Sequence, residues 1–429
     1  MRPAAFLAVA EPNAAVTYEP PIRLLAGPSP RAGSEPFAQH LERLGGLPPG
    51  SRRGDLISTL EASGLLGRGG AGFPVGRKWR SVAERADSRA VVVVNGAEGE
   101  PGSVKDRALM TLRPHLVIDG AILAAGAVGA QEIVVYIGEE HGNARAAMGR
   151  AIEERAREIA RPIRIVAAPE GYVSGEASAA VHYINIGDAR PTTTPPRTSE
   201  SGVRGRPTLV QNVESLAYAA LIARYGDSWY RSVGQAETPG TALLTIGGAA
   251  EKSGVCEIEL GLTVGEVADL TGATESGTRA VLLGGYFGSW AGVGESWDLP
   301  LDPAIMRARD LAFGCGIVSF LPAATCGVSA TAEIMAYMAA ESAGQCGPCV
   351  FGLRAIAETT TRLAAGSPAT GDLDNIERWS DQIPGRGACR HPDGAVELMT
   401  SALNVFGDEF AHHERAGRCS ITGAQVQVA

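Results

Sequence analysis

The chain has 429 residues, of which 45% are hydrophobic, and this length allows roughly three domains with sizeable cores, which excludes wholesale disorder. Its formal net charge of -9 argues against a general nucleic-acid binder, because such proteins need a basic face. Its 55 glycines follow no fixed period, which is typical of tight turns and ligand loops and excludes a collagen.

The first 53 residues are rich in Pro, Ala and Gly and predict an extended N-terminal arm with one helix at 37–44. A second helix is expected at 55–63, with Asp55 as its cap, and it leads directly into a glycine-rich segment. A dinucleotide fingerprint of the Rossmann type has a strand before its glycines. The helix in that place therefore disfavours a standard Rossmann site.

After the glycine-rich segment, apolar strands alternate with helices. The expected strands are 90–94, 132–137 and 163–167, and the expected helices are 114–130, 143–160 and 174–186. Such alternation indicates a mainly parallel sheet covered on both faces. We therefore predict an α/β domain over residues 54–238.

The pattern changes near Pro239. Strands at 241–247, 255–260 and 279–283, with a helix at 264–270, predict a compact β-rich unit over 239–325. From residue 329 the pattern is helical, with segments at 329–343, 352–364, 373–383 and 395–413. Four such segments predict a helix bundle in a C-terminal domain over 326–429.

The cellular location is predicted from three features: apolar stretches, the N-terminal residues and the cysteines. Its longest apolar stretch, 121–130, is too short to span a membrane. The apolar residues 3–10 resemble a weak signal peptide, but nothing after them supports secretion. Seven cysteines, two of them in a CxxC, fit a reducing compartment better than a disulfide framework. We expect a cytoplasmic protein without direct membrane insertion.

The segment Gly67–Trp79, GRGGAGFPVGRKW, is the strongest chemical signal. Five glycines let the backbone N–H groups approach a ligand, and the interleaved cations Arg68, Arg77 and Lys78 supply charge for phosphate. The alternative is a purely structural loop, since short glycine motifs are common. Five glycines in ten residues favour a phosphate-bearing cofactor.

An acidic segment, Asn95–Gly102, follows the first expected strand. Its Glu98 and Glu100 lie just past the strand end, where ligands collect in open α/β sheets. Carboxylates repel phosphate, so they are expected to accept hydrogen bonds from ribose hydroxyls, a flavin ring or an amide. The alternative is a solvated turn stiffened by Pro101.

The cysteines Cys346 and Cys349 form a CxxC, and Cys389 lies between two later helices. Three thiolates are too few for a closed zinc site or a four-thiolate cluster, so a fourth ligand comes from elsewhere, from water, or does not exist. Taken singly, a cysteine such as Cys256 is usually a small buried hydrophobe. Candidates for a fourth ligand are Cys315, Cys326, Cys419 and His391. His412 and His413 close the last helix, where they complement its dipole, and no chemistry is assigned to them.

Six motifs in one order connect these segments to a known family. They are GRGGAGFPVGRKW, NGAEGEPGSVKDR (95–107), YVSGEAS (172–178), RGRPTLVQNVESLA (204–217), GQCGPCVFG (344–352) and Cys389. Together they resemble the flavin-bearing, NADH-oxidising 51 kDa-type (F) subunit of respiratory complex I and the diaphorase subunit of NAD-linked hydrogenases. The resemblance implies an FMN-binding α/β domain, a β-grasp-like (SLBB) unit and a four-helix domain that holds a [4Fe–4S] cluster.

The resemblance also implies roles for individual residues. Gly67, Arg68, Gly69, Gly70 and Lys78 would cradle FMN; Asn95, Glu98, Tyr172, Gly175, Glu176 and Asn212 would line its isoalloxazine and ribityl chain. Phe73 would stack near the nicotinamide, and Glu100 would lie beside the dinucleotide. Cys346, Cys349 and Cys389 would hold cluster iron.

The chain departs from the family pattern at four places. Ala97 replaces an Asp, and Ala177 replaces a Glu. The segment 194–198 reads TPPRT where the family has KPPFP, so Arg197 stands where a Phe would stack on adenine. Ala343 replaces the first cysteine of the cluster motif. Three outcomes follow from this replacement. The cluster recruits another ligand, with Cys326 as the first choice; or it keeps an exchangeable iron or a three-iron form; or it is lost.

These motifs predict an NAD(P)H dehydrogenase in which hydride passes from NAD(P)H to FMN. Single electrons then pass to the cluster and on to a partner, such as ferredoxin or a larger complex. That larger complex can be one associated with a membrane. The four departures motivate an alternative, a non-catalytic paralogue that serves as an assembly or scaffold subunit. A third reading reverses the flow, with reduced ferredoxin delivering electrons to NAD(P)+.

Overall fold

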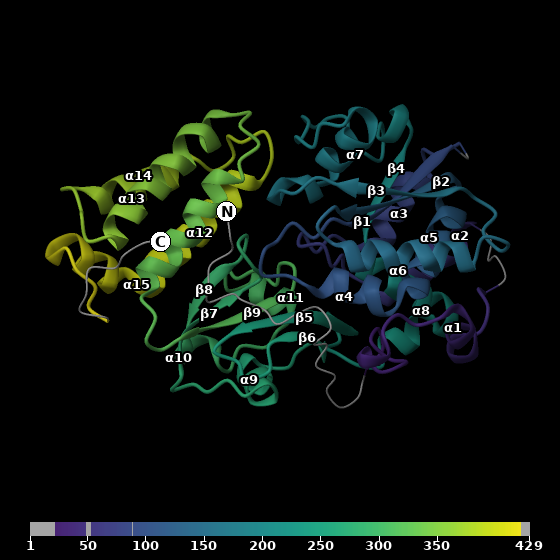
Figure 1. Cartoon of the computed structure of the whole chain (residues 1–429), viewed down its shortest axis with the longest axis horizontal. Coiled ribbons are helices and arrows are strands. Elements are labelled where there is room, and N and C mark those ends of the chain that lie inside the picture. The colour runs from purple at the N-terminus through teal and green to yellow at the C-terminus, as the bar shows by residue number, and fades with distance from the viewer. Residues whose placement is uncertain (1–21, 49–52, 88, 422–429) are drawn as a thin grey trace.

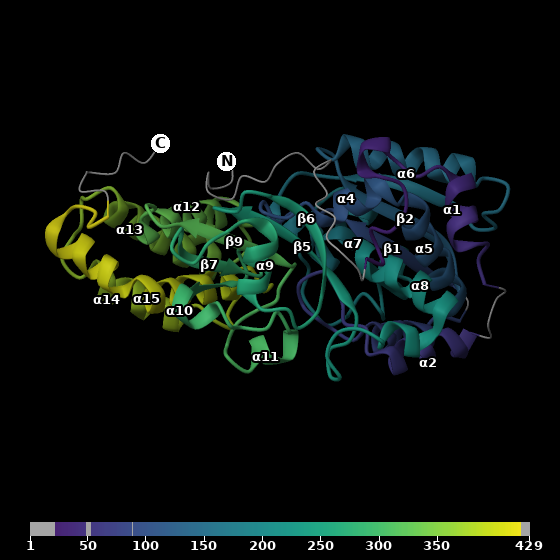
Figure 2. The ribbon, with the colours of Figure 1, turned by 90° about the horizontal axis from the view of Figure 1, so that it is seen from below.

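The computed structural model describes residues 22–48, 53–87 and 89–421. Figure 1 shows three regions along the molecule: an α/β region with α1–α8, a second sheet with α9, and a group of helices, α12–α15. In the perpendicular view of Figure 2 the second sheet again lies between the other two regions.

The first sheet has four parallel strands, as the alternating pattern predicts. They are β1 (Ala90–Gly96), β2 (Ala130–Gly138), β3 (Ile163–Ala168) and β4 (Thr208–Asn212), in the order β3-β2-β1-β4. The register pairs Asn95 of β1 with Asn212 of β4. Because the strands are parallel, their carboxyl ends meet at one edge, and both asparagines lie there.

Side chains of β1 alternate between two hydrophobic cores. Val92 and Val94 pack with the core that includes residues of α2, α3, α5, α6 and α8, whereas Val91 and Val93 pack with residues of α7. These helices are α2 (Arg53–Ser63), α3 (Val75–Ala83), α5 (Pro114–Val128), α6 (Gly142–Glu154), α7 (Ala177–Ile186) and α8 (Val213–Tyr230). A strand buried on both faces reads as a continuous apolar run, which explains the sequence of β1.

Several helix expectations in this region need correction. α6 ends at Glu154 rather than at residue 160, and residues 174–186 are not one helix. A 3₁₀ turn, η3 (Tyr172–Gly175), comes first, and Glu176 then caps α7. Asp55 lies in the first turn of α2 and does not cap it. The short helices α3 and α4 (Lys105–Leu112) were not predicted, so the glycine-rich loop ends at Pro74.

The described part of the N-terminal segment packs against the rest of the chain. It contains η2 (Pro30–Ala32) and α1 (Phe37–Leu44), the latter with the predicted bounds. Leu24 and Leu25 are buried, and the Glu257 carboxylate accepts hydrogen bonds from their backbone N–H groups at 2.9 and 3.0 Å. Leu24 and Leu25 are therefore part of the α/β core, whereas residues 1–21 and 49–52 of the predicted arm lie outside the described residues.

The second sheet has five strands in the order β6-β5-β9-β7-β8. They are β5 (Thr241–Gly248), β6 (Gly254–Glu259), β7 (Thr278–Leu283), β8 (Ser289–Gly292) and β9 (Ile317–Pro322). β5 and β9 are parallel, and the other neighbours are antiparallel. The helices α9 (Val264–Thr271), α10 (Val293–Ser296) and α11 (Pro303–Arg307) complete this region. The sequence predicted β5, β6, β7 and α9 but missed β8 and β9.

Helices follow at all four positions expected after residue 326. They are α12 (Gly327–Ala340), α13 (Arg354–Ala364), α14 (Asp372–Gln382) and α15 (His391–Ala416), with a π-helical turn, η5 (Pro348–Leu353), before α13. Their hydrophobic core also contains Ala280 and Leu282 of β7 and Trp290 of β8. The helical region thus shares its core with the second sheet.

No single helix in the described part of the chain is long and apolar enough to cross a membrane. The pair α4 and α5 meets the length and composition test only when both are taken together, and the two are bent by 97°.

Candidate functional site

Four segments distant in sequence meet at the carboxyl edge of the parallel sheet. They are the glycine-rich loop, the segment after β1, the turn η3 after β3, and the start of α8 after β4. The ends of parallel strands are where ligands bind in α/β proteins. The four sequence motifs of the α/β region therefore belong to one place, whereas the cysteine motif lies in the helical region.

The glycine-rich loop is held together by a hydrogen bond between its two ends, and Gly69 and Gly70 between them are exposed. The Gly67 N–H donates to the Phe73 carbonyl at 2.9 Å. The Arg68 N–H donates to the Ser215 hydroxyl at 3.0 Å, which ties the loop to the first turn of α8. A Cβ at Gly69 would lie 3.3 Å from the Cβ of Asn212, and Gly70 has a φ of +104°. Glycine is therefore needed for close approach at one position and for conformation at the next.

The Arg68 guanidinium points into the protein and not into the loop. It donates to the Thr241 carbonyl at 3.1 Å and to the Tyr230 hydroxyl at 3.3 Å, and Glu214 lies 3.6 Å from its Nε. The expectation that this cation offers its charge to phosphate is therefore wrong for the side chain. Its backbone N–H is also in use, because it donates to the Ser215 hydroxyl.

Of the other two cations of the segment, Arg77 is exposed, and Lys78 is the one withdrawn from solvent. It is half-buried on α3, and among the described residues it forms no ion pair. Burial lowers the pKa of its ammonium from 10.5 to about 8, and the charge of Glu176 opposes that shift. A desolvated ammonium without a partner gains much from an anionic ligand.

Glu98 has a structural task. Its carboxylate accepts hydrogen bonds from the backbone N–H groups of Asp106 and Arg107 at 2.8 and 3.0 Å, in the first turn of α4. It also accepts from the Ser103 hydroxyl at 2.7 Å. The carboxylate thus satisfies free amides at the start of a helix that the sequence did not predict.

Glu100 keeps one free carboxyl oxygen. Its Oε2 accepts from the Tyr172 hydroxyl at 2.8 Å and from the Tyr286 N–H at 3.1 Å. Its Oε1 is buried and has no hydrogen-bond partner among the described residues. Burial raises the pKa of this carboxyl to about 7, although the hydrogen bond from Tyr172 opposes the shift. A buried polar atom without a partner at a ligand edge indicates that something else pairs with it.

The other predicted flavin residues hold the four segments together. The Asn95 amide donates to the Gly175 carbonyl at 2.8 Å, and Glu176 caps α7 by accepting from the N–H groups of Ser178 and Ala179. Asn212 caps α8, and its amide donates to Asp106 at 2.6 Å. The structure therefore brings together all the predicted site residues of the α/β region but uses many of their side chains internally.

A buried charge cluster under the site was not singled out from the sequence. The Lys105 ammonium lies 2.6 Å from Asp106 and 2.9 Å from Glu214. Burial raises the pKa of Asp106 to about 7 although Lys105 opposes it. Both Lys105 and Asp106 belong to the motif at 95–107, so the signal was present, but nothing in it distinguishes ligands from supports.

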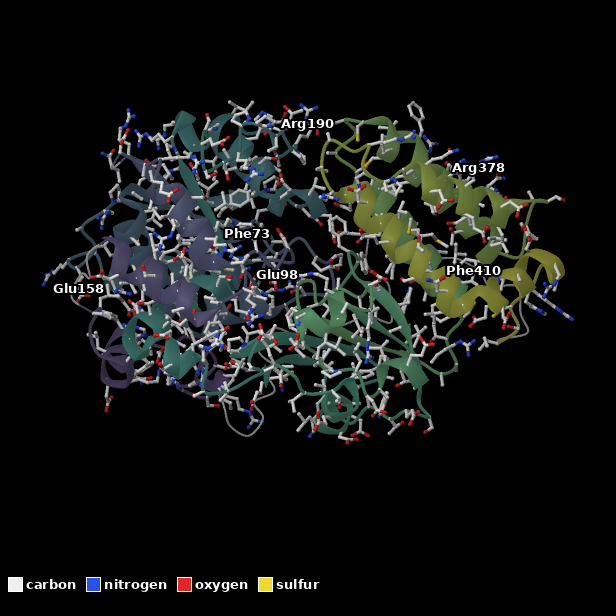
Figure 3. All side chains as sticks on the ribbon, turned by 180° about the vertical axis from the view of Figure 1, so that it is seen from behind. Phe73, Glu98, Glu158, Arg190, Arg378 and Phe410 are labelled. Atoms are coloured by element: carbon white, nitrogen blue, oxygen red, sulfur yellow. The ribbon has the colours of Figure 1, made fainter. Side chains whose placement is uncertain are left out.

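A cavity of about 800 Å³ opens beside the glycine-rich loop. Its lining includes Gly70 and Gly72 of the loop, Phe313 of the middle region, and Glu397 and Asn404 of α15. Phe73 is 54% exposed, and in Figure 3 it and Glu98 lie on the side of the α/β region that faces the rest of the molecule. The space beside the loop is large enough for a nucleotide.

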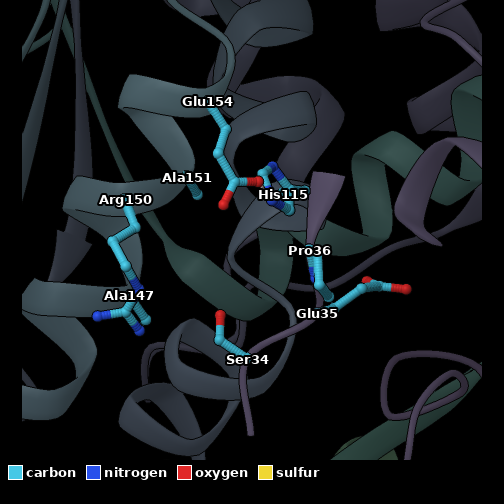
Figure 4. Close-up of a pocket in the computed structure, with 8 residues that line it drawn as sticks. All are labelled: Ser34, Glu35, Pro36, His115, Ala147, Arg150, Ala151 and Glu154. Atoms are coloured by element: carbon cyan, nitrogen blue, oxygen red, sulfur yellow. Dashed lines mark ion pairs between the residues drawn. The ribbon is translucent and has the colours of Figure 1, made fainter. Parts of the chain in front are cut away.

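A smaller cavity of about 240 Å³ lies elsewhere, between the residues just before α1 and the helix α6 (Figure 4). It is lined by residues such as Glu35, His115 and Glu154, and His115 lies 3.3 Å from Glu154. None of the predicted site residues lines it. It is therefore not part of the candidate site.

The three predicted cluster cysteines are neighbours in the helical region. Burial raises the pKa of the Cys349 thiol to about 12, a hydrogen bond with Ser342 lowers it, and the nearby Cys346 and Cys389 raise it. Nε2 of His391, which follows Cys389 closely in sequence, donates to the Met338 carbonyl at 2.7 Å, and its buried Nδ1 has no partner among the described residues. Three neighbouring thiols suit iron in donor type, although in the described residues their sulfur atoms do not form a group within 4.8 Å of one another.

Cys326 does not lie with these three thiols. It caps α12 at one end, whereas the CxxC follows the other end, and 14 helical residues span about 21 Å. Its Sγ is instead 3.4 Å from Nε2 of His413. Cys326 as the first choice for the missing cluster ligand is therefore wrong.

Comparison with known proteins agrees with the geometry. Residues 60–220 match the family model described as the Nuo51 FMN-binding domain, and residues 329–413 match the NADH-ubiquinone oxidoreductase-F iron-sulfur binding region. An F subunit of NADH-quinone oxidoreductase in Rhizobium meliloti is 32% identical over 85% of this chain and 90% of its own. The F subunit of the same enzyme in Mycobacterium tuberculosis is 32% identical over 89% and 88%. This chain belongs to the family of NADH-quinone oxidoreductase F subunits.

A solved structure extends the likeness beyond this family's respiratory members. A chain of an NAD+-reducing [NiFe]-hydrogenase in the air-oxidised state superposes with a TM-score of 0.76 at 29% identity. The match covers 84% of this chain but 63% of the hydrogenase chain, so the hydrogenase chain is considerably longer. The resemblance inferred from the motifs is confirmed.

The structure describes the surroundings of two residues that depart from the pattern of this family, Ala97 and Arg197. Ala97 is buried, and its methyl group lies 3.4 Å from where a Cβ on Gly175 would be. Arg197 is exposed, its backbone N–H donates to Glu200 at 2.9 Å, and within the described ranges its guanidinium has no hydrogen-bond or ion-pair partner. The fold around both positions is retained.

Proposed function

We propose that this chain oxidises NADH or NADPH at an FMN held on the carboxyl edge of the parallel sheet. It then passes electrons one at a time to iron held by Cys346, Cys349 and Cys389 and on to a partner redox subunit. The observation that carries the proposal is the meeting of four distant segments around one unpaired cation, Lys78, and one unpaired carboxyl oxygen on Glu100. FMN supplies the exchange between two-electron and one-electron chemistry.

The residues of the edge divide into binding and positioning groups. The exposed backbone of Gly69 and Gly70 and the Lys78 ammonium would bind the phosphate. The start of α8, to which the loop is tied, adds the positive end of a helix. Asn95 and Asn212 keep the strand ends and turns in register and so position the ring.

Glu100 and Phe73 are proposed for the dinucleotide. The free Oε1 of Glu100 can accept a hydrogen bond when ionised and donate one when protonated, and its pKa of about 7 allows both states. Phe73 is exposed beside the cavity and offers a ring for stacking. Arg197 in place of an aromatic residue leaves the choice between NADH and NADPH to experiment.

The domain limits are also proposed here: an arm at 1–53, the FMN domain at 54–238, a β-grasp-like (SLBB) unit at 239–325 and a helical iron–sulfur domain at 326–429. Support for the third comes from its sheet, in which the first and last strands are parallel neighbours at the centre. Support for the fourth comes from α12–α15 around the three thiols.

For the ligand missing at Ala343, we propose Ser342. It lies close enough to Cys349 to lower the pKa of that thiol, whereas Cys326 is remote. Ala343→Cys should then give a more stable cluster than Ser342→Ala, as measured by iron and sulfide content and by EPR.

We also propose ferredoxin as the electron acceptor and the cytoplasm as the location. The relatives are named as subunits of an enzyme, which supports a partner subunit for this chain.

An anaerobic titration tests the function. Protein reconstituted with FMN and iron is mixed with NADH and, separately, with NADPH, while the flavin absorbance is followed. Bleaching by either nicotinamide is expected. A protein that binds no flavin, or binds it and is not reduced, would instead support the scaffold alternative motivated by Ala97, Ala177, Arg197 and Ala343.

A further inference from the structure

A second group of metal-ligand side chains lies in the helical region, away from the CxxC. It consists of Cys326, His413 and Cys419, whose ligand atoms all lie within 4.8 Å of one another. We propose that these three residues bind a zinc ion that is separate from the iron–sulfur site. The proposal does not depend on the oxidoreductase function.

The distances suit a tetrahedral ion. Zinc bonds of about 2.3 Å to sulfur and 2.0 Å to nitrogen place those two atoms roughly 3.5 Å apart at a tetrahedral angle. The Sγ of Cys326 lies 3.4 Å from Nε2 of His413. No movement of the backbone is needed to place an ion between them.

The orientation of His413 also fits a ligand. Its Nδ1 lies 2.9 Å from the Leu363 carbonyl, which can only accept, so Nδ1 carries the proton. Nε2 then carries the lone pair, and it lies within 4.8 Å of both thiols. A ring fixed through its second nitrogen by a carbonyl is the usual support of a metal-bound histidine.

The surroundings are dry and hold the sulfur atoms in place. Cys326 and Cys419 are 3% and 2% exposed, and His413 is completely buried. The backbone N–H of Ile421 donates to the Cys419 sulfur at 3.3 Å. Such a bond favours the thiolate form, which is the form that binds metal.

The ligand types select zinc among common ions. Two soft thiolates and one imidazole suit zinc, whereas calcium and magnesium need oxygen ligands. When Zn²⁺ binds, the two thiols lose their protons to solvent and become thiolates, so each zinc dithiolate formed releases two protons. The group contains three residues among those described. We assign the fourth position of the tetrahedron to a water molecule.

The position of the three ligands suggests what the ion does. Cys326 is the first residue before α12, His413 is in the last turns of α15, and Cys419 follows the end of α15. A zinc ion here would connect the segment after α15 to the start of α12. It would stabilise the helical region and leave the electron path unchanged.

Zinc content and coordination of the whole purified protein test the proposal. About one zinc per chain is expected, and its X-ray absorption should show two sulfur neighbours and at least one imidazole nitrogen. A shell of three sulfurs would place the zinc at Cys346, Cys349 and Cys389 and would overturn the proposal. So would absence of zinc after dialysis against buffered Zn²⁺.

Matched variants locate the ion. Cys326→Ser and Cys419→Ser should each lower zinc content at least tenfold, whereas Cys256→Ser, a buried cysteine in β6, should leave it unchanged. Cys346→Ser should lose iron and keep zinc. If a variant fails to fold, the absorption spectrum of the unaltered protein still decides. Zinc retained by both serine variants would contradict the assignment and leave only a thiol–imidazole hydrogen bond.

Discussion

Lys78 is the residue whose titration should reveal the phosphate site. Its pKa of about 8 without ligand should return toward 10.5 when a phosphate lies beside it, so binding takes up a proton above pH 8. FMN affinity should therefore be constant from about pH 7 to 8 and fall by up to about tenfold per unit above it, since the phosphate is already doubly ionised. Fluorescence quenching of FMN at a series of pH values measures this.

Lys78→Met should weaken FMN binding about 10- to 100-fold and remove the fall above pH 8, because a charge-assisted hydrogen bond is lost. Arg77→Gln is the control, since Arg77 is an exposed cation one residue away on the same helix. Equal losses in both variants would mean that general attraction, and not a bound phosphate at Lys78, governs affinity.

Glu100 should make stability depend on pH. Its carboxyl has a pKa of about 7 in the folded protein against 4.5 when unfolded, so the folded state holds the proton longer. Stability should then fall as the pH rises from 4.5 to 7, by up to about 3 kcal/mol, and stay low above 7. Glu100→Gln keeps the shape without the charge, and its melting temperature should exceed that of the unaltered protein at pH 8 more than at pH 5. Parallel melting curves across that range would refute the assignment.

At this scale the sequence located the site better than it described it. The motifs named segments that do meet, but Arg68 was expected to face phosphate and faces Glu214 instead. Glu98 was expected beside the flavin and instead accepts hydrogen bonds from two backbone N–H groups in the first turn of α4. Such uses depend on the partners that tertiary packing supplies, and α4 was not predicted. The meeting of Cys326 with His413, 87 residues away, has no local signal at all.

Among the elements, the long apolar ones were predictable and the short polar ones were not. The strands of the parallel sheet are buried on both faces and so read as apolar runs. α3 and α4 have eight or nine residues and begin without a side-chain cap, so their helical pattern is weak. β8 has four residues and is stabilised by its neighbours β7 and α15.

The packing of α5 on α8 gives a prediction for a pair of glycines on one helix. A Cβ at Gly120 would lie 2.0 Å from the Leu216 carbonyl oxygen, whereas one at Gly126 meets nothing within 4 Å. Gly120→Ala should therefore destabilise the protein by about 3 kcal/mol or more, because backbone must move. Gly126→Ala should stabilise it by up to about 1 kcal/mol, because alanine favours the helix. Chemical denaturation measures both, and similar losses in the two variants would contradict the close approach of the helices.

On the scale of the whole molecule, the proposed domain limits do not coincide with the cores. Trp290 of β8 stacks edge-on against Phe406 of α15 at 5.4 Å, and its backbone N–H donates to the Ser401 hydroxyl at 2.9 Å. Arg279 of β7 also pairs with Glu409 of α15. A sequence pattern marks where composition changes, but it does not show which faces remain apolar after each region folds.

The shared core predicts how fragments behave. Residues 326–429 expressed alone would expose the faces that pack on β7 and β8, so this fragment should bind a hydrophobic dye and melt without cooperativity. A fragment of residues 239–429 keeps those contacts and should unfold cooperatively. Arg279→Ala in the whole chain is the matched single change, and it should lower the stability of both regions together, because loss of the ion pair between them leaves Glu409 without its partner. Hydrogen exchange measured by region would show this, and a loss of protection confined to the second sheet would mean that the two regions unfold independently.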